Sequence, residues 1–272
     1  MKKQAEEKLF NKYLALLKIN KAAPDLNLLK NIVRAHLIRI PFENISKLLY
    51  KKQGIKSIPD LPTYLEGIEK YNFGGTCYSN NYYLYLLLKY LGYDIKLCGA
   101  DMKNPDVHII SIVKINNNEY IVDCGYAAPF FEPLRRDLSE NYILNFGIEL
   151  YKLKPKDIAG RTKVEQYYDG KLQHWYTAKP MARMIGDFRE VIEKSYSDDA
   201  VFMNAVRITK FLNSGAIVLK NLSLTEVIGN KSSTINFSLT DLASVIQKKF
   251  DMPIDLVERA ISHFKELRDI YD

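Results

Sequence analysis

The chain has 272 residues, of which 47% are apolar and 26% are charged, and its formal net charge is +7. These values are typical of a globular protein with a substantial core, and they exclude a collagen-like or low-complexity chain. The basic residues are spread along the sequence, so we expect no nucleic-acid partner. No apolar run has the length of a membrane span, and we expect no membrane association.

The compartment is predicted from the N-terminus and from the cysteines. The first residues are polar and adopt helical periodicity at once, which does not fit a signal peptide. The three cysteines, Cys77, Cys98 and Cys124, are too few for a disulfide framework, and no pair has metal-ligand spacing. We therefore expect a cytoplasmic protein with free thiols and no metal.

The first third of the chain is predicted to be helical, because apolar residues recur at three- and four-residue steps. One helix surrounds residues 9–17, and a second opens at Pro24–Asp25 and ends before Pro41. A short helix is expected over 61–70. A strongly apolar helix is expected from Cys77 to about residue 91, where Gly92 ends it.

The middle third changes to the period of strands. Strands are expected over 93–102, 107–115 and 119–123, and Asn116–Asn118 is a credible tight turn between the last two. A second hairpin is expected over 163–176, turning at Asp169–Gly170. These segments predict an antiparallel sheet.

The last third mixes helices and strands. Its expected elements are a helix over 188–196, strands over 207–211, 216–219 and 222–227, a helix capped by Ser238 or Thr240 that runs to Phe250, and a final helix over about 254–271. The chain therefore reads as α+β, with helices first, then antiparallel sheet, then an α+β tail.

Cys77 is the candidate nucleophile. It follows Gly74 and Gly75 and begins a predicted helix. Glycines allow a sharp turn at which substrate can approach the sulfur, and a helix N-terminus concentrates positive potential. Both features favour the thiolate, which still needs a basic partner near neutral pH.

His108 is the candidate partner. Among His36, His108, His174 and His263, only His108 begins a strongly apolar predicted strand, and Asp123 ends the strand paired with it. The hairpin brings the two positions near each other. The carboxylate can then hold one ring nitrogen while the other nitrogen meets the sulfur.

Each of these residues also has a plainer interpretation. A cysteine at a helix start can be a small core residue, and a histidine at a strand end can be structural. Asp123 can cap a turn, and Asp101 and Asp106 are alternative partners for His108, although they precede its strand. The joint occurrence of the three residues favours catalysis.

Three blocks of sequence resemble the arylamine N-acetyltransferase family. Residues 40–45 resemble its Pro-Phe-Glu-Asn segment, and residues 74–81 resemble its glycine-glycine-x-cysteine block. Residues 108–126 resemble its histidine strand and Val-Asp-x-Gly-Phe block, with Pro133–Leu134 following. The resemblance covers roughly residues 10–137 and is far less specific beyond them.

The resemblance implies a fold and a division of the chain. It implies a helical bundle over 1–92 that carries Cys77, a central antiparallel β-barrel over 93–185 and a C-terminal α/β lid over 186–272. The catalytic core of such a fold is similar to that of cysteine proteases, with the triad falling on Cys77, His108 and Asp123. These are expectations from the family and not from spacing.

The resemblance also implies an enzyme, an acyltransferase with a ping-pong reaction. The acetyl group of acetyl-CoA moves to Cys77, and an arylamine, hydrazine or similar small amine then takes it. The family's oxyanion stabilisation falls on backbone amides near Cys77 and at Cys124–Gly125. Its cofactor and substrate cleft falls on Gly125, Tyr126 and Ala127.

The sequence departs from the family pattern at three positions. Phe73 stands where the family has an arginine that pairs with the glutamate equivalent to Glu43, so we expect a substitute cation or another arrangement around Glu43. Glu43 fixes the loop of Cys77 or caps the turn after Pro41. Ser79 and Ala127 also differ from the usual residues, which leaves donor and acceptor preference open.

Two other functions stay open at this point. The same triad supports an amide synthase or an acyltransferase with another thioester donor. A non-catalytic binding protein of the same fold is the second alternative, although a structural role does not need all three groups.

Overall fold

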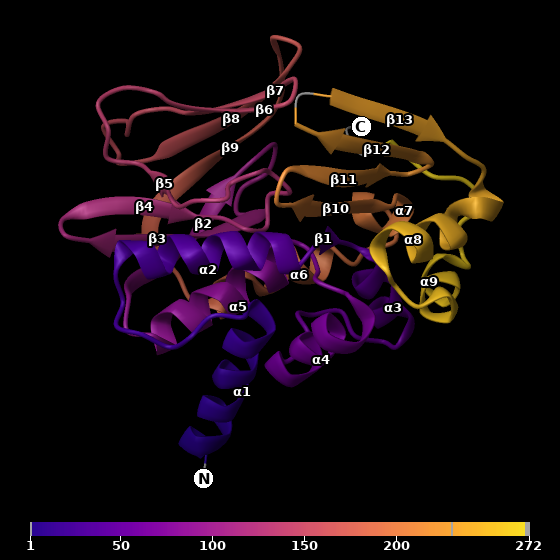
Figure 1. The fold of residues 1–272 in the computed structure, drawn as a ribbon, viewed down its shortest axis with the longest axis horizontal. Helices are drawn as coiled ribbons and strands as arrows, with labels where there is room; N and C mark the ends of the chain where they lie inside the picture. Colours follow the sequence, from indigo (N-terminus) through magenta and orange to yellow (C-terminus); the bar gives the residue numbers. More distant parts are fainter. Residues whose placement is uncertain (1, 230, 270–272) are drawn as a thin grey trace.

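A computed structural model describes residues 2–229 and 231–269 of the chain (Figure 1). Its N-terminal part is mainly helical, as predicted. The elements of this part are α1 (Lys2–Leu17), α2 (Leu26–Arg39), β1 (Phe42–Glu43), α3 (Ile45–Lys52), α4 (Leu61–Tyr71) and α5 (Cys77–Tyr90). Helix α2 begins where the sequence predicts, because the Asp25 carboxylate accepts a hydrogen bond of 2.7 Å from the Leu28 amide.

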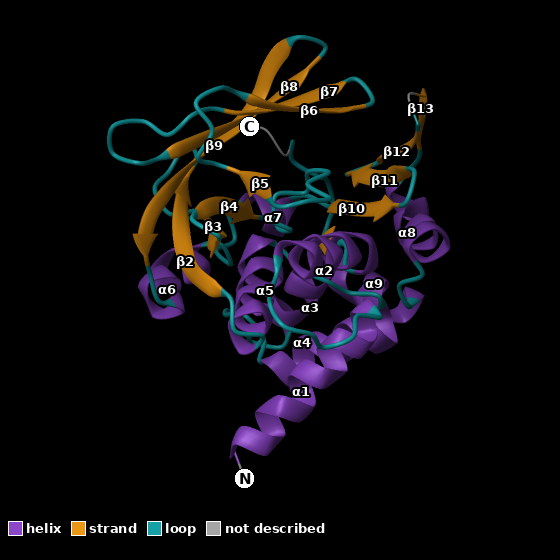
Figure 2. Cartoon of the chain, turned by 60° about the vertical axis from the view of Figure 1, so that its left-hand side comes forward, coloured by secondary structure: helices purple, strands orange, loops and turns teal. Residues whose placement is uncertain are grey.

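The middle part is an eight-stranded antiparallel sheet with the order β5-β4-β3-β2-β9-β8-β7-β6. The sheet curls into a nearly closed barrel, which Figure 2 shows above the helices. Its strands are β2 (Asp94–Asp101), β3 (His108–Ile115), β4 (Asn118–Val122), β5 (Leu134–Arg135), β6 (Tyr142–Phe146), β7 (Glu149–Leu153), β8 (Thr162–Tyr168) and β9 (Lys171–Ala182). Both predicted hairpin turns are confirmed, with Asn116, Asn117, Asp169 and Gly170 in the left-handed region.

The C-terminal part combines a second antiparallel sheet, of order β1-β10-β11-β12-β13, with short helices. Its elements are η1 (Ile185–Phe188), α6 (Arg189–Lys194), α7 (Val201–Asn204), β10 (Arg207–Leu212), β11 (Gly215–Lys220), β12 (Ser223–Ile228), β13 (Lys231–Asn236), η2 (Leu239–Asp241), α8 (Leu242–Phe250) and α9 (Ile254–Ile261). The α+β class and the order of helices, barrel and mixed tail are therefore as predicted.

Several elements differ from the sequence prediction. Helix α3 and strands β5, β6, β7 and β13 were not expected. The side chains of β13 are all exposed, so this strand carries no buried-face alternation that a pattern could reveal. The prediction of a helix to residue 271 is wrong, because α9 ends at Ile261; residues 270–271 lie outside the described part.

Strand β1 connects the N-terminal helical part of the chain to the C-terminal sheet. Phe42 pairs with Thr209 and Glu43 with Ile208 on β10. The Glu43 amide donates a 3.0 Å hydrogen bond to the Gly75 carbonyl in the loop before α5. The C-terminal sheet, the segment before α3 and the loop of Cys77 are thus joined by backbone hydrogen bonds.

The apolar core brings the helices against the barrel. Helix α5 packs on β2 and β3, so it lies between the N-terminal helices and the central sheet (Figure 2). One cluster joins Leu65 and Leu84 to Phe211, and another joins Leu48 and Ile109 to Leu242. Because these clusters cross the expected segment boundaries, the division at residues 92 and 185 stays a prediction. Within the described residues, no helix is both long and apolar enough to cross a bilayer.

Replacement of Gly74 by alanine tests the packing of the loop before Cys77. A Cβ at Gly74 would lie 2.0 Å from the Pro41 carbonyl oxygen and 2.9 Å from the Ile40 Cγ2. Gly186 is a matched control, since nothing lies within 4 Å of its Cβ position. We expect Gly74→Ala to lower the free energy of unfolding in urea by about 1–3 kcal/mol and Gly186→Ala to lower it much less. Equal effects would contradict this packing.

Candidate active site

Cys77 is the first residue of α5, and the loop before it has little room for side chains. Gly75 has φ of +139°, and a Cβ there would lie 2.0 Å from the Ser79 Oγ. A side chain there would collide with the Ser79 hydroxyl, and the positive φ would strain any residue other than glycine. Cys77 itself is partly exposed, whereas Cys98 and Cys124 are buried. Among the three thiols, only that of Cys77 is open to a reagent.

His108 and Asp123 lie side by side beneath this thiol. The His108 Nε2 is 2.8 Å from the Asp123 Oδ2, and both side chains are at most 1% exposed. The strand register explains the contact: Ser111 pairs with Val122, so Asp123 follows β4 close to the start of β3. The other ring nitrogen, Nδ1, is left for the sulfur, and Cys77 is close enough to influence the charge of the ring.

Asn81, one turn into α5, ties this pair to the helix that begins with Cys77. Its Nδ2 donates to the Asp123 Oδ1 at 2.8 Å and to the Ile109 carbonyl at 2.6 Å, and its Oδ1 accepts from the Cys124 amide at 2.8 Å. The Gly125 amide donates to the Asp123 Oδ1 at 3.0 Å. The carboxylate is thus held from three sides, and its rotation is restricted.

The electrostatics favour a charged pair. Burial alone would lower the pKa of His108, but the Asp123 carboxylate, its hydrogen bond and Cys77 together raise this pKa to about 10. Burial raises the pKa of Asp123, but the His108 charge and the bonds from Asn81 and Gly125 bring it below its ordinary value. The raised pKa of His108 therefore adds stability that is complete below the ordinary histidine pKa of 6.5 and is lost as the pH rises through about 10. The lowered pKa of Asp123 adds stability that is complete above the ordinary aspartate pKa of 3.8 and is lost as the pH falls through the lower pKa of the folded state.

The alternative carboxylates do not reach His108. Asp101 and Asp106 instead bind the Lys179 ammonium at 2.7 and 2.6 Å, and Asp106 also pairs with Arg183 at 3.2 Å. This cluster holds the loop before β3. Among the three aspartates considered from the sequence, Asp123 is the one that the structure brings to the histidine.

One expectation for the oxyanion donors is wrong. The Cys124 and Gly125 amides already donate to Asn81 and Asp123, so they are not free to bind a developing oxyanion. The first amides of α5 remain, because the first turn of a helix leaves its N–H groups without intrahelical acceptors. The amide of Cys77 is the donor nearest to the sulfur by chain position.

The three residues expected at the cofactor cleft play different parts in the structure. A Cβ on Gly125 would lie 2.5 Å from the Cys77 Cα, so this glycine allows close contact with the Cys77 backbone. The Tyr126 hydroxyl forms a 2.7 Å hydrogen bond with the His174 Nδ1. Ala127 has φ of +59°, a conformation that costs an alanine more than a glycine.

Glu43 has no cation as its partner among the described residues. Its carboxylate accepts hydrogen bonds from the Ser46 amide at 2.9 Å, the Ser46 hydroxyl at 2.5 Å and the Gly74 amide at 3.1 Å. Both interpretations of Glu43 are therefore correct, because it caps α3 and also holds the loop before Cys77. Burial raises the pKa of Glu43, while these hydrogen bonds oppose the rise.

The sequence did not point to three further residues at the site. The ring of Tyr176 lies 5.0 Å from that of His108, centroid to centroid. His174 faces Tyr126, and burial, with the charges of His108 and Lys103, lowers the pKa of His174 to about 4. Lys47 lies behind the Cys77 loop. No motif marks these positions, since only the packing of β9 and α3 brings them to the site.

No cluster of three or more metal-binding side chains occurs in residues 2–229 and 231–269.

The fold and this cysteine–histidine–aspartate cluster define a class of α+β proteins with a helix-borne thiol beside a β-barrel. A family model described as N-acetyltransferase matches residues 25–259, which is most of the chain. The structure of the Salmonella typhimurium arylamine N-acetyltransferase superposes with a TM-score of 0.78 at 18% identity, covering 94% of this chain and 98% of that chain. The chain belongs to the arylamine N-acetyltransferase family.

Curated relatives match a shorter part of the chain. The arylamine N-acetyltransferase pineal gland isozyme NAT-3 of Gallus gallus is 32% identical over 115 residues, 39% of this chain and 38% of that protein. The N-malonyltransferase FDB2 of Fusarium pseudograminearum (strain CS3096) is 28% identical over 155 residues, 49% of this chain and 41% of that protein. The aligned part of the chain thus spans about four tenths of the length of these relatives.

Alkylation with iodoacetamide tests the exposure of the thiols. We expect one carbamidomethyl group, on Cys77, in the folded protein near neutral pH, and three groups after unfolding. Burial raises the pKa of Cys98 to about 12 and that of Cys124 well above its ordinary value, so both stay as unreactive thiols. Intact mass and peptide mapping measure the result. Modification of Cys98 or Cys124 at the rate of Cys77 would contradict it.

Proposed function

We propose that the chain is an acyltransferase that moves the acetyl group of acetyl-CoA to an arylamine, a hydrazine or a similar small amine through a thioester on Cys77. The single observation that carries the proposal is the 2.8 Å contact between His108 and Asp123 next to a partly exposed cysteine at a helix N-terminus. This arrangement supports a nucleophilic role for Cys77, a proton-transfer role for His108 and an orienting role for Asp123.

In the first half-reaction, the thiolate of Cys77 attacks the carbonyl carbon of acetyl-CoA. A carbon–sulfur bond forms to Cys77, and the bond between the acetyl carbon and the CoA sulfur breaks. The His108 imidazolium gives its Nδ1 proton to the leaving CoA thiolate. Asp123 keeps the ring oriented through Nε2, and the Cys77 amide at the start of α5 is placed to donate to the oxyanion.

In the second half-reaction, the amine attacks the thioester on Cys77. His108, now neutral, accepts a proton from the amine nitrogen, and the bond between the acetyl carbon and Cys77 breaks. The products are the N-acetylated amine and the Cys77 thiolate beside an imidazolium, as at the start. Atoms and charge balance over the two steps without a metal.

We also propose that Gly125, Tyr126 and Ala127 border the approach to the thiol. Gly125 supports this assignment because it contacts the Cys77 backbone, and Tyr126 supports it because its ring lies 5.7 Å from that of His108. The hydrogen bond from Tyr126 to His174 gives this wall a polar edge. An aromatic amine could contact the partly exposed Tyr126 there and meet a polar group.

A second donor is favoured by one specific observation. Ala127 adds a methyl group, at φ of +59°, where the family has glycine, and one relative is an N-malonyltransferase. The altered wall supports a different acyl group on the same CoA carrier as the alternative proposal. The chemistry at Cys77 would be unchanged.

A panel of acyl-CoA thioesters separates these proposals. We expect acetyl-CoA to increase the intact mass of the protein by one acetyl group. The Cys77→Ala variant should gain no acetyl group and should keep the unfolding temperature of the unaltered protein. An amine acceptor should then remove the acetyl group. Acylation by malonyl-CoA or another thioester, but not by acetyl-CoA, would show that acetyl-CoA is not the acyl donor. If no thioester acylates Cys77, the remaining alternative is a non-catalytic binding protein of the same fold.

Replacement of Asp123 by asparagine tests the orienting carboxylate. The imidazole loses the charge that raises its pKa, so we expect the acylation rate of Asp123→Asn to fall by about 10²–10⁴-fold. Asp101→Asn is the matched control, because Asp101 binds Lys179 and does not reach His108. Stopped-flow release of free CoA measures both rates. Near-normal acylation by Asp123→Asn would exclude Asp123 as the orienting group.

A further inference from the structure

Lys47 is a buried cation behind the Cys77 loop. It lies on α3, and only 5% of the residue is exposed. Its Nζ donates a 2.6 Å hydrogen bond to the Ser195 Oγ, and the Ser195 hydroxyl itself donates to the Ile192 carbonyl at 2.5 Å. The ring centroids of Tyr196 and Tyr78 lie 4.3 and 5.8 Å from Nζ. All these partners are neutral.

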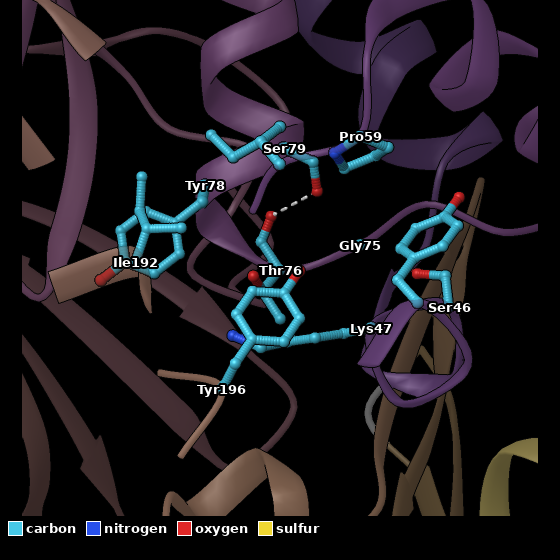
Figure 3. A pocket seen from close by; sticks show the side chains of 11 residues that line it. Ser46, Lys47, Pro59, Gly75, Thr76, Tyr78, Ser79, Ile192 and Tyr196 are labelled. Carbon is cyan, nitrogen blue, oxygen red and sulfur yellow. Dashed lines mark hydrogen bonds between the residues drawn. The ribbon is translucent and has the colours of Figure 1, made fainter. Parts of the chain in front are cut away.

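A small cavity connects Lys47 with the start of α5. Its volume is about 20 Å³, close to the space that one water molecule needs. Thr76 and Tyr78, the two neighbours of Cys77 in the chain, line it together with Lys47 and Ser79. Figure 3 shows the Lys47 side chain extending toward Thr76 and Tyr196 inside this space. The ammonium and the first turn of α5 thus face the same interior.

A buried ammonium without an opposite charge is costly. The charged groups that act on Lys47 are Cys77, which favours its protonated form, and Lys51, which opposes it; no carboxylate of the described residues is among them. Among the groups that act on Lys47, the anion is therefore the Cys77 thiolate. At low local dielectric, a cation close to the start of α5 would appreciably stabilise the thiolate form of Cys77 relative to the thiol.

We propose that Lys47 is a positioning residue of the catalytic site, which supplies the Cys77 thiolate with a positive charge in addition to that of His108. This inference rests on the proposed function, since it concerns the charge of the same sulfur. The imidazolium of His108 and the ammonium of Lys47 would then both stabilise the thiolate. When Cys77 is acylated, its negative charge disappears and Lys47 loses its counter-charge, which favours return of the free thiolate.

The other titratable groups around Lys47 do not provide that counter-charge. Tyr50 lines the same cavity, and burial raises its pKa above the ordinary tyrosine value. Burial does the same for Tyr78 and Tyr196. All three phenols therefore stay neutral near physiological pH. Glu43, on the segment before α3, accepts hydrogen bonds from Ser46 and Gly74 and is not among the charged groups that act on Lys47.

The same burial has a consequence for stability. It lowers the pKa of Lys47 to about 8. A lysine with a lowered pKa in the folded state destabilises the fold below that pKa, and the penalty disappears as the pH rises toward the ordinary lysine value. Replacing Lys47 by an apolar residue of similar length should therefore not lower stability near neutral pH. This separates a charge role from a merely structural one.

The test compares Lys47→Met with Lys51→Met on the same face of α3. Lys51 is the matched control, because its Nζ pairs with Asp198 at 2.6 Å and lies closer to solvent. The rate of Cys77 alkylation by iodoacetamide is measured against pH. We expect the pH of half-maximal rate to rise by about one unit in Lys47→Met and to stay unchanged in Lys51→Met. The unfolding temperature of Lys47→Met should equal or exceed that of the unaltered protein.

Lys47→Arg keeps the charge and tests the same point independently. Its pH of half-maximal alkylation rate, the midpoint, should equal that of the unaltered protein. An unchanged midpoint in Lys47→Met, or a raised one in Lys47→Arg, would overturn the proposal. A midpoint that moves when chloride is replaced by gluconate at equal ionic strength would assign the counter-charge to a bound anion, and would also overturn it.

The measurement keeps this inference distinct from the proposed function. Alkylation needs no acyl donor and no amine. If Cys77 of the unaltered protein reacts no faster than a free cysteine near neutral pH, the proposed function itself fails. If Cys77 reacts quickly and Lys47→Met behaves like the unaltered protein, only the role of Lys47 fails.

Discussion

The site depends on the burial of one carboxylate, that of Asp123. A buried aspartate is tolerated only when its oxygens are bonded and its charge is matched. Here Asn81 and the Gly125 amide bind one oxygen, and His108 binds the other. Because Asn81 lies on the helix that begins with Cys77, the same bonds fix the distance between the histidine and the thiol. A change in Asp123 would therefore affect Cys77, the His108 ring and the segment of Cys124 and Gly125 at once.

Much of this arrangement could be predicted from the sequence, because its signals are local. The glycines before Cys77, the apolar strand after His108 and the Asn116–Asn118 turn specify a helix start and a hairpin with fixed register. The hairpin then brings residues 108 and 123 together whatever the rest of the chain does. The order of helices, antiparallel strands and mixed tail followed from changes of hydrophobic period, and the barrel was expected from the family resemblance. The three-part division of the chain remains a prediction.

The rest depends on contacts between distant segments that no local pattern reveals. Strand β1, which leads into helix α3, forms only by pairing with β10 from the far end of the chain. Lys47 is an ordinary lysine in the sequence and becomes a buried cation only through Ser195 and Tyr196. His174 reaches Tyr126 through the pairing of β9 with β2. The amides of Cys124 and Gly125 were expected to be free donors, and bonds to Asn81 and Asp123 occupy them.

The charge of the His108 ring is the quantity that decides between a catalytic and a structural cluster. Nitrogen-15 NMR of the histidine ring, recorded against pH with His36, His174 and His263 as internal comparisons, measures it directly. We expect His108 to keep protons on both ring nitrogens well above the ordinary histidine pKa of 6.5, and to lose one only as the pH approaches about 10. A His108 ring that becomes neutral near 6.5 would contradict the charged pair with Asp123 and the activated thiol that depends on it.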